Sequence, residues 1–271
     1  MDTRIWSEGL SLTGRAGGES SSVIKVGGAV VEDAESLRVL LDQFCLIPGP
    51  KVLVHGGGRT ATHLAKQLGI ESKMVGGRRI TDAEMLRIVT MVYGGLVNKN
   101  IVAQLQARGV NALGLTGADM NIVRAHRRPV TPEGIDFGYV GDVDGADGER
   151  LLQLLQMGIT PVIAPLTHDG HGQMLNINAD TMAQTVAVAL AGGGALTYCF
   201  ELPGVMRDPD DPSSLIPHIT EESFKALVAD GTISGGMIPK LENAFAALRA
   251  GVTSVRITNI SNLQGGTEIS T

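Results

Sequence analysis

Short apolar runs rich in β-branched residues alternate along the chain with stretches whose apolar residues recur at helical spacing. The first run, residues 23–26, precedes a helical pattern over 33–44, and a second run, 52–54, precedes another over 61–68. Such alternation indicates a parallel sheet that carries helices on its faces. Ligands of these sheets bind beyond the carboxyl ends of the strands, so we look for chemistry in the segments that follow each strand.

The same alternation continues to the end of the chain. A Thr-x-x-Glu capping box at residues 81–84 marks one helix start. The polar stretch 122–144 alternates in polarity between Gly and Pro turns, which predicts β-hairpins. Further helices are predicted over about 81–98, 97–108, 151–157, 181–191, 221–229 and 240–248, and further strands over 160–166, 196–200 and 255–258.

Glycines end the first two apolar runs: Gly27-Gly28 follows the first, and residues 56–58 are three glycines that follow the second. Glycine lets the backbone approach a ligand without a Cβ in the way, and a helix N-terminus offers unpaired N–H groups and a positive dipole end to an anion. The pattern therefore favours a phosphate or carboxylate site. A tight turn needed only for packing is the alternative interpretation.

Single cations accompany these glycines. Lys25 lies inside the first apolar run, where it is either a snorkelling surface residue or a cation aimed at the ligand of the glycines. Lys240 follows another diglycine, residues 235–236, at a helix start. Arg78 and Arg79 are neighbours in an extended segment, so at most one of them is expected to face the site. An arginine there suits a carboxylate because its planar fork makes two parallel bonds.

Three polar residues, Asn176, Asn178 and Asp180, alternate at the start of an Ala-rich helix. All three could be helix caps. One cap suffices for a helix, however, and their spacing leaves all three on one side of an extended segment. The surplus indicates a row of side chains that faces a ligand.

Composition limits the classes of partner. The chain has 271 residues, 43% of them hydrophobic, which fits one large α/β domain or two small lobes. A net charge of −6 without a block of Lys or Arg argues against nucleic acid or an anionic membrane as partner, and no apolar run reaches the length of a membrane span. Cys45 and Cys199 are isolated, which suits a reducing cytoplasm. Residues 1–22 are rich in Gly and Ser, so we expect a mobile leader there.

Five segments, in this order and spacing, resemble those of the amino acid kinase family: residues 24–28, 54–58, 77–81, 176–180 and 235–240. The resemblance covers the chain from about residue 23 to its end and is strongest to the branch that phosphorylates N-acetyl-glutamate. It implies a three-layer α/β/α sandwich around a mainly parallel sheet. It also implies an N-terminal lobe, 23–180, that binds the acyl amino acid and forms a dimer, and a C-terminal lobe, 181–271, that binds the nucleotide.

Roles for individual residues follow from the resemblance. Lys25 and Lys240 would stabilise the phosphoryl group in flight, and Asp180 would orient the two lysines. The resemblance further implies acceptor contacts by Gly57, Gly58, Arg79, Asn176 and Asn178, and nucleotide contacts by Gly27, Gly28, Glu201, Gly204, Met206, Thr232 and Ser234. No protein ligand for a metal is expected, because Mg²⁺ would be held mainly by the phosphates of ATP.

The implied reaction is ATP-dependent phosphorylation of the γ-carboxylate of N-acetyl-L-glutamate in arginine biosynthesis. This carboxylate is already ionised near neutral pH, so the reaction requires cations around the transferring group and no general base. Phe200-Glu201 stands where relatives usually have Thr or Ser followed by Asp. Arginine-inhibited relatives carry an N-terminal helix that links dimers into hexamers, whereas the leader here is rich in Gly and Ser, so we expect an uninhibited homodimer. N-succinyl-glutamate as the acceptor, another kinase of the same fold, and a non-catalytic amino acid or nucleotide sensor are the alternatives.

Overall fold

The structure is a computed structural model of the chain, and it describes residues 21–76, 78–190, 194–208, 210–235 and 237–271. The predicted leader, residues 1–22, lies outside the described residues except for Ser21 and Ser22. Ser22 is the first residue of strand β1.

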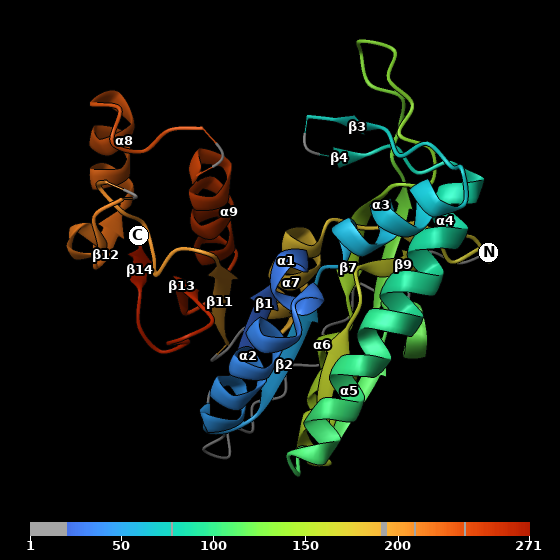
Figure 1. The fold of residues 1–271 in the computed structure, drawn as a ribbon, viewed down its shortest axis with the longest axis horizontal. Helices are drawn as coiled ribbons and strands as arrows, with labels where there is room; N and C mark the ends of the chain where they lie inside the picture. The colour runs from blue at the N-terminus through green and yellow to red at the C-terminus, as the bar shows by residue number, and fades with distance from the viewer. Residues whose placement is uncertain (1–20, 77, 191–193, 209, 236) are drawn as a thin grey trace.

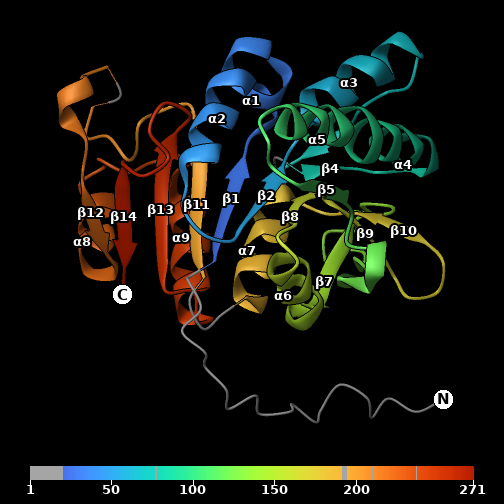
Figure 2. The same cartoon turned by 90° about the horizontal axis from the view of Figure 1, so that it is seen from below.

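In the described ranges, eight strands form a central sheet with the order β12-β14-β13-β11-β1-β2-β8-β5. Figure 1 shows the part of this sheet from β12 to β2, and Figure 2 also labels β8 and β5. Neighbouring strands are parallel except for β13 and β14, which are antiparallel. The central strands form from the β-branched runs because both faces are buried: Val23, Ile24 and Val26 have no exposed surface. The bounds are β1 Ser22–Val26, β2 Lys51–His55, β5 Ala112–Leu115, β8 Thr160–Ile163, β11 Ala195–Phe200, β12 His218–Thr220, β13 Ser254–Asn259 and β14 Thr267–Ser270.

Helices cover both faces of the central sheet (Figure 2). One face carries α1 Gly28–Glu32, α2 Ala34–Leu46, α3 Gly58–Gln67, α4 Ala83–Val89, the π-helix η1 Thr90–Val97 and α5 Asn98–Ala107. The other carries α6 Gly148–Gln156, α7 Ala179–Ala189, α8 Glu221–Ala229 and α9 Met237–Arg249. A separate apolar core lies beneath each set of helices. The predicted three-layer α/β/α fold with a mainly parallel sheet is thereby confirmed. None of the helices in the described ranges is long and apolar enough to cross a membrane.

A second, smaller sheet lies beside the central one, with the order β10-β9-β6-β7. Its strands are β6 Val123–Arg127, β7 Gly141–Ala146, β9 Leu166–His168 and β10 Met174–Asn176. Because β6 and β7 are antiparallel, the hairpin predicted within residues 122–144 is confirmed. The described ranges also contain a short hairpin, β3 Met74–Val75 with β4 Arg78–Arg79, and two 3₁₀ turns, η2 Asp119–Asn121 and η3 Pro212–Ser214.

The helix predicted from residue 81 starts one residue later than the capping box indicated. Asp82 is the N-cap of α4, and its carboxylate accepts a hydrogen bond of 2.8 Å from the Met85 N–H. Thr81 does not cap the helix, because its Oγ1 accepts a hydrogen bond of 3.0 Å from the buried amide of Asn176. The capping-box prediction is therefore wrong: a contact with a distant part of the chain engages the threonine, and the adjacent aspartate takes its place.

The strand order brings three strand ends to one edge of the sheet. β1 lies between β11 and β2 in parallel register, with Val26 opposite both Cys199 and His55. The carboxyl ends of these strands therefore open on the same side, where parallel sheets bind their ligands. Both glycine-rich turns and the loop that begins at Glu201 start there.

Candidate active site

The two glycine-rich turns pack against each other backbone to backbone. A Cβ on Gly28 would lie 3.2 Å from the Gly57 nitrogen and 3.3 Å from the Gly58 nitrogen, and a Cβ on Gly56 would lie 2.9 Å from the Gly28 nitrogen. These contacts explain why both strands end in glycines. The second turn leads into the N-terminus of α3, whose first N–H groups have no acceptor within the helix. The Thr60 N–H of this first turn donates a hydrogen bond of 2.6 Å to Glu32 Oε1, and the nitrogens of Gly57 and Gly58 lie at the contact between the turns.

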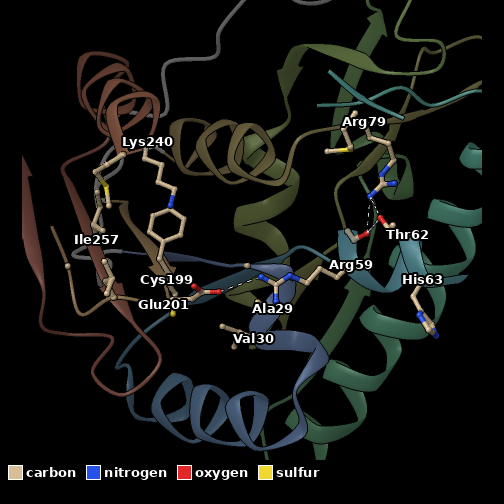
Figure 3. A pocket seen from close by; sticks show the side chains of 18 of the residues that line it. Ala29, Val30, Arg59, Thr62, His63, Arg79, Cys199, Glu201, Lys240 and Ile257 are labelled. Atoms are coloured by element: carbon tan, nitrogen blue, oxygen red, sulfur yellow. Dashed lines mark hydrogen bonds and ion pairs between the residues drawn. The ribbon is translucent and has the colours of Figure 1, made fainter. Parts of the chain in front are cut away.

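A cavity of about 830 Å³ opens beside these turns. Its walls come from the turn after β1, from α3, from the end of β11 with its loop, and from α9. Figure 3 shows Lys240 of α9 on one side of the cavity and Arg59 and Arg79 on the other. Arg59 forms an ion pair of 3.6 Å with Glu201 of the β11 loop. The volume lies within the range typical of small-molecule sites, about 300–1,000 Å³.

A second cavity, of about 420 Å³, adjoins the first and shares Gly58, Met74 and Arg79 with it. Its other walls come from the turn after β2, the start of β7, the π-helix, and the segment from the end of β10 into α7. Tyr93 of the π-helix lines this cavity, and burial raises the pKa of its phenol, so the group stays neutral. The two cavities therefore meet at the first residue of α3.

Arginines dominate the polar lining of the smaller cavity. The guanidinium of Arg79 donates hydrogen bonds of 2.9 Å to the Gly58 carbonyl and 2.8 Å to Thr62 Oγ1. Arg78 lines the smaller cavity too, as does Arg128, whose guanidinium is paired with Asp142. The expectation that at most one of the adjacent arginines faces the site is therefore wrong. Both arginines belong to β4, a two-residue strand that pairs with β3 and lies outside the central sheet.

Two lysines converge on one aromatic ring. Lys25 forms an ion pair with Asp180, with 2.6 Å between Nζ and Oδ1, and its side chain is only 8% exposed. The Nζ atoms of Lys25 and Lys240 lie 5.2 Å and 3.8 Å from the ring centroid of Phe200. Burial lowers the pKa of Lys240, and the nearby charge of Lys25 lowers it further, while Asp180 and Glu201 oppose the shift. The site therefore brings both ammonium groups over the Phe200 ring and pairs Lys25 with Asp180.

The polar residues at the start of α7 divide their roles. Asn178 is the N-cap of α7, and its Oδ1 accepts a hydrogen bond of 2.8 Å from the Asp180 N–H. Asp180 lies in the first turn of the helix and reaches Lys25 from there. The three residues therefore do not form a row along one extended segment, and that prediction is wrong. Asn176 and Asn178 nevertheless line the smaller cavity.

The residues predicted to contact the nucleotide lie in two groups. Those that line the larger cavity are Gly27, Gly28, Glu201 and Gly204. Gly204 is also needed for packing, since a Cβ there would lie 2.5 Å from the Leu215 side chain. The residues that do not line it are Met206, Thr232 and Ser234. The nucleotide contacts of all seven stay a prediction.

Sequence reasoning missed three residues of the site. Arg59 follows the triple glycine directly and opens a helix, and that position is a signal that could have identified it. Phe200 was noted only as a departure in the nucleotide loop, and Tyr93 was not singled out. Both reach the site through tertiary contacts: Phe200 because β11 pairs with β1, and Tyr93 because its ring lies 3.0 Å from where a Cβ on Gly57 would be.

The described ranges contain no group of three or more His, Cys, Asp or Glu side chains placed to hold a metal ion. The Asp180 carboxylate is already engaged by Lys25.

Comparisons with known proteins identify similar chains. The model of the amino acid kinase family matches residues 21–259. Curated relatives include the acetylglutamate kinase of Bacteroides thetaiotaomicron, 61% identical over 248 residues that cover 91% of this chain and 96% of the relative. That of Cytophaga hutchinsonii is 55% identical over 243 residues, covering 89% and 92%. A solved structure, carbamate kinase from Giardia lamblia bound to AMP-PNP, has a TM-score of 0.64 at 16% identity, covering 93% of this chain and 98% of that chain, and is a likeness of fold alone.

Proposed function

Because the chain belongs to the amino acid kinase family, we propose that it transfers the γ-phosphoryl group of ATP to the γ-carboxylate of N-acetyl-L-glutamate in arginine biosynthesis. This is the activity of an acetylglutamate kinase, and its products are N-acetyl-glutamyl 5-phosphate and ADP. Curated acetylglutamate kinases that are 59% to 61% identical and cover more than nine-tenths of the chain support the assignment.

The observation that carries the proposal is the wall shared by two adjoining cavities. The larger cavity has the size of a nucleotide site and the smaller one suits an acyl amino acid with two carboxylates. Gly58 belongs to both, so a phosphoryl group that passes between the ligands moves past the N-terminus of α3. Lys25 and Lys240 both lie over the ring of Phe200, and Lys240 and Phe200 line the larger cavity.

The proposed chemistry is positioning and charge neutralisation. The attacking carboxylate needs no base, because it is ionised near neutral pH. Lys25 and Lys240 stabilise the charge of the transferring group, and Asp180 holds Lys25 in place. The backbone N–H groups of Gly57 and Gly58 donate to the same oxygens. Mg²⁺, carried by the phosphates of ATP, would supply further positive charge.

The remaining assignments extend this proposal. Arg79 and Asn176 hold the acceptor, within an N-terminal lobe of residues 23–180, and residues 181–271 bind ATP. We also propose a cytoplasmic homodimer formed through the N-terminal lobe. Free Cys45 and Cys199 are consistent with the compartment, and the exposed apolar side chains of the π-helix, Met91 and Leu96, are consistent with an interface.

A coupled assay of ADP release tests the function. We expect turnover that depends on N-acetyl-L-glutamate and is absent with ATP alone. Aspartate, glutamate, carbamate and UMP serve as acceptor controls, and turnover on one of them in place of the acyl-glutamate would assign the chain to another kinase of this fold. Binding of ATP or of the acyl-glutamate without turnover on any acceptor would instead identify a sensor and refute the proposal.

N-succinyl-L-glutamate is a second candidate acceptor, and one observation favours it. The smaller cavity is lined by Arg78 in addition to Arg79, whereas its third arginine, Arg128, is paired with Asp142 of the same lining, so Arg78 is the guanidinium that a further carboxylate of the acceptor would meet. A succinyl group would bring a third carboxylate. Measuring kcat/KM for both acyl-glutamates side by side decides between them. Preference for the succinyl substrate that disappears in Arg78→Ala would establish this second candidate, and preference for the acetyl substrate would exclude it.

A further inference from the structure

The second glycine-rich turn is preceded by a histidine that the proposed chemistry does not use. His55 is the last residue of β2 and has no exposed surface. Its Nδ1 lies 2.7 Å from the carbonyl oxygen of Gly56, the residue that opens the turn. The imidazole therefore contacts the turn from the core side, opposite the cavities.

Two carbonyl groups determine where the proton of this imidazole lies. The Gly56 oxygen can only accept, so Nδ1 must carry the proton. On the other side, Asn98 Nδ2 lies 2.9 Å from the Val162 carbonyl oxygen and 3.1 Å from His55 Nε2. Since the Val162 carbonyl requires a donor, this nitrogen is the amide NH₂ group, and it also faces Nε2. Nε2 must then accept, so His55 is held as the neutral Nδ1–H tautomer.

The surroundings oppose a second proton on the imidazole. Burial lowers the pKa of His55 to about 4, the bond to Gly56 acts in the opposite direction, and the Lys99 ammonium lowers the pKa further. Lys99 also donates a hydrogen bond of 3.2 Å to Asn98 Oδ1, which helps to fix the amide. Gly114 makes room for that amide, because a Cβ there would lie 2.0 Å from Asn98 Oδ1. The tautomer is therefore set by packed neighbours.

The fixed tautomer has a consequence for the turn. The C=O and N–H of a trans peptide point in opposite directions, and no cis peptide bond occurs in the described ranges. A Gly56 carbonyl drawn towards the core therefore turns the Gly57 N–H away from the core. Gly57 lines the smaller cavity, and its nitrogen lies beside Gly28.

We propose that His55 is a positioning residue: through the Gly56 carbonyl it aims the Gly57 N–H at the phosphoryl group in transfer. The inference rests on the proposed function, which brings that phosphoryl group to the turn. The imidazole touches neither substrate. It acts by keeping a backbone donor in the orientation that the transition state requires, so that no reorganisation is needed during the reaction.

Two substitutions separate this role from simple packing. Asn places its amide nitrogen near the position of Nδ1, so His55→Asn keeps a donor for Gly56. Gln places its amide near the position of Nε2, so His55→Gln keeps a partner for Asn98 and fills more of the space, but loses the donor to Gly56. Loss of one oxyanion donor costs about 10²–10³ in kcat. We therefore expect His55→Asn to retain kcat within about threefold of the wild type and His55→Gln to fall at least about tenfold, with smaller changes in KM.

ADP release gives kcat for the three proteins, and thermal unfolding monitored by circular dichroism compares their stabilities. A packing role predicts the reverse order, with activity following stability and Gln the better substitute. Equal kcat values, or a more active His55→Gln, overturn the inference and leave the proposed function intact. Absence of turnover by the wild type on any acceptor contradicts the proposed function, and the inference with it.

A second measurement does not depend on the variants folding. ¹⁵N NMR of the wild-type imidazole should show the neutral Nδ1–H tautomer from about pH 5 to 8. An Nε2–H tautomer, or protonation near the ordinary pKa of 6.5, overturns the inference.

Discussion

Replacing Lys240 by methionine removes the charge of this residue and keeps most of its packing. The Lys240 ammonium lies 3.8 Å from the ring centroid of Phe200, and methionine retains an unbranched stem that can lie over the same ring. If Lys240 stabilises the phosphoryl group in flight, Lys240→Met leaves Lys25 as the one lysine of the proposed pair beside the transition state. The change therefore tests the charge and not the shape of the site.

We expect a large loss of turnover with little loss of stability. Removing one preorganised partner of a transition-state charge lowers kcat by about 10²-fold or more, which corresponds to about 2.7 kcal/mol. The folded state gains from the substitution, because burial and the charge of Lys25 both disfavour the Lys240 ammonium and lower its pKa. It loses a cation–π contact worth about 1 kcal/mol. These effects oppose each other, so the free energy of unfolding should change by no more than about 1 kcal/mol.

The assay measures kcat by coupled ADP release and the free energy of unfolding by urea titration. Lys225→Met is the matched control, since Lys225 is an exposed lysine on α8 away from both cavities. Turnover by Lys240→Met that equals that of the control would refute the reasoning, because the charge would then have no role. A loss of turnover accompanied by an equally large loss of stability would also refute it, since the two effects are predicted to separate.

The same residue predicts how activity depends on pH. The pKa of Lys240 is lowered from 10.5, so the wild type should lose activity on the alkaline side, at a pH below 10.5, as this ammonium loses its proton. Lys240→Arg keeps a cation that stays protonated throughout this range and should retain partial turnover without the alkaline loss. An alkaline loss that is identical in the wild type and in Lys240→Arg would show that another group titrates.

Three further predictions concern the residues around the turns. Asp180→Asn leaves the Lys25 ammonium unpaired. Because the carboxylate is a quarter exposed, we expect the free energy of unfolding in urea to fall by about 2 kcal/mol and kcat to fall about 10²-fold. An unchanged kcat would contradict the role of the pair. Gly28→Ala places a Cβ against the backbone nitrogens of Gly57 and Gly58 and should lower kcat about tenfold. Gly27→Ala is the control, because its Cβ meets nothing within 4 Å, and it should lower kcat less. Equal losses would argue against a role for the close approach of the two turns. Between pH 6.5 and about 4, His55 is charged in the unfolded state and neutral in the folded state, so the free energy of unfolding falls as the pH falls through this interval. We expect His55→Asn to remove about 3 kcal/mol of this acid destabilisation, measured by urea unfolding at pH 7 and pH 4. An identical pH dependence in the variant would show that the buried histidine is not its source.

The elements nearest the site could be predicted because local patterns determine them. An apolar run that ends in glycines before a helical pattern specifies a strand, a turn and a helix N-terminus without reference to the rest of the chain, and the structure has all three after both β1 and β2. Lys25 could be selected for the same reason, since a cation inside a buried strand is unusual whatever packs against it. The pairing of Lys25 with Asp180 came from the family resemblance, because no local pattern connects the two residues.

The errors arose where a distant contact decided between two local possibilities. Thr81 and Asp82 are both good helix caps, and the structure uses Asp82 because Thr81 bonds to Asn176. The spacing of Asn176 and Asn178 fitted either a strand or a helix start, and the start of α7 at residue 179 removed the common face. The position of Phe200 beneath two lysines depends on the pairing of β11 with β1, which no sequence pattern specifies.

β1 is the strand at which the two sides of the central sheet meet, and the proposed phosphoryl-transfer centre lies at its carboxyl end. The strands β11, β13, β14 and β12 extend the sheet on one side of β1, and β2, β8 and β5 extend it on the other. The larger cavity has β11 and α9 in its walls, whereas the smaller one has the start of β7 and the end of β10. The residues that line both cavities are Gly58, Met74 and Arg79, and Gly58 belongs to the turn that follows β2. Lys25, Asp180 and Lys240 are absent from the lining of the smaller cavity, so with the roles proposed for them acceptor specificity can change there without any change in these three residues.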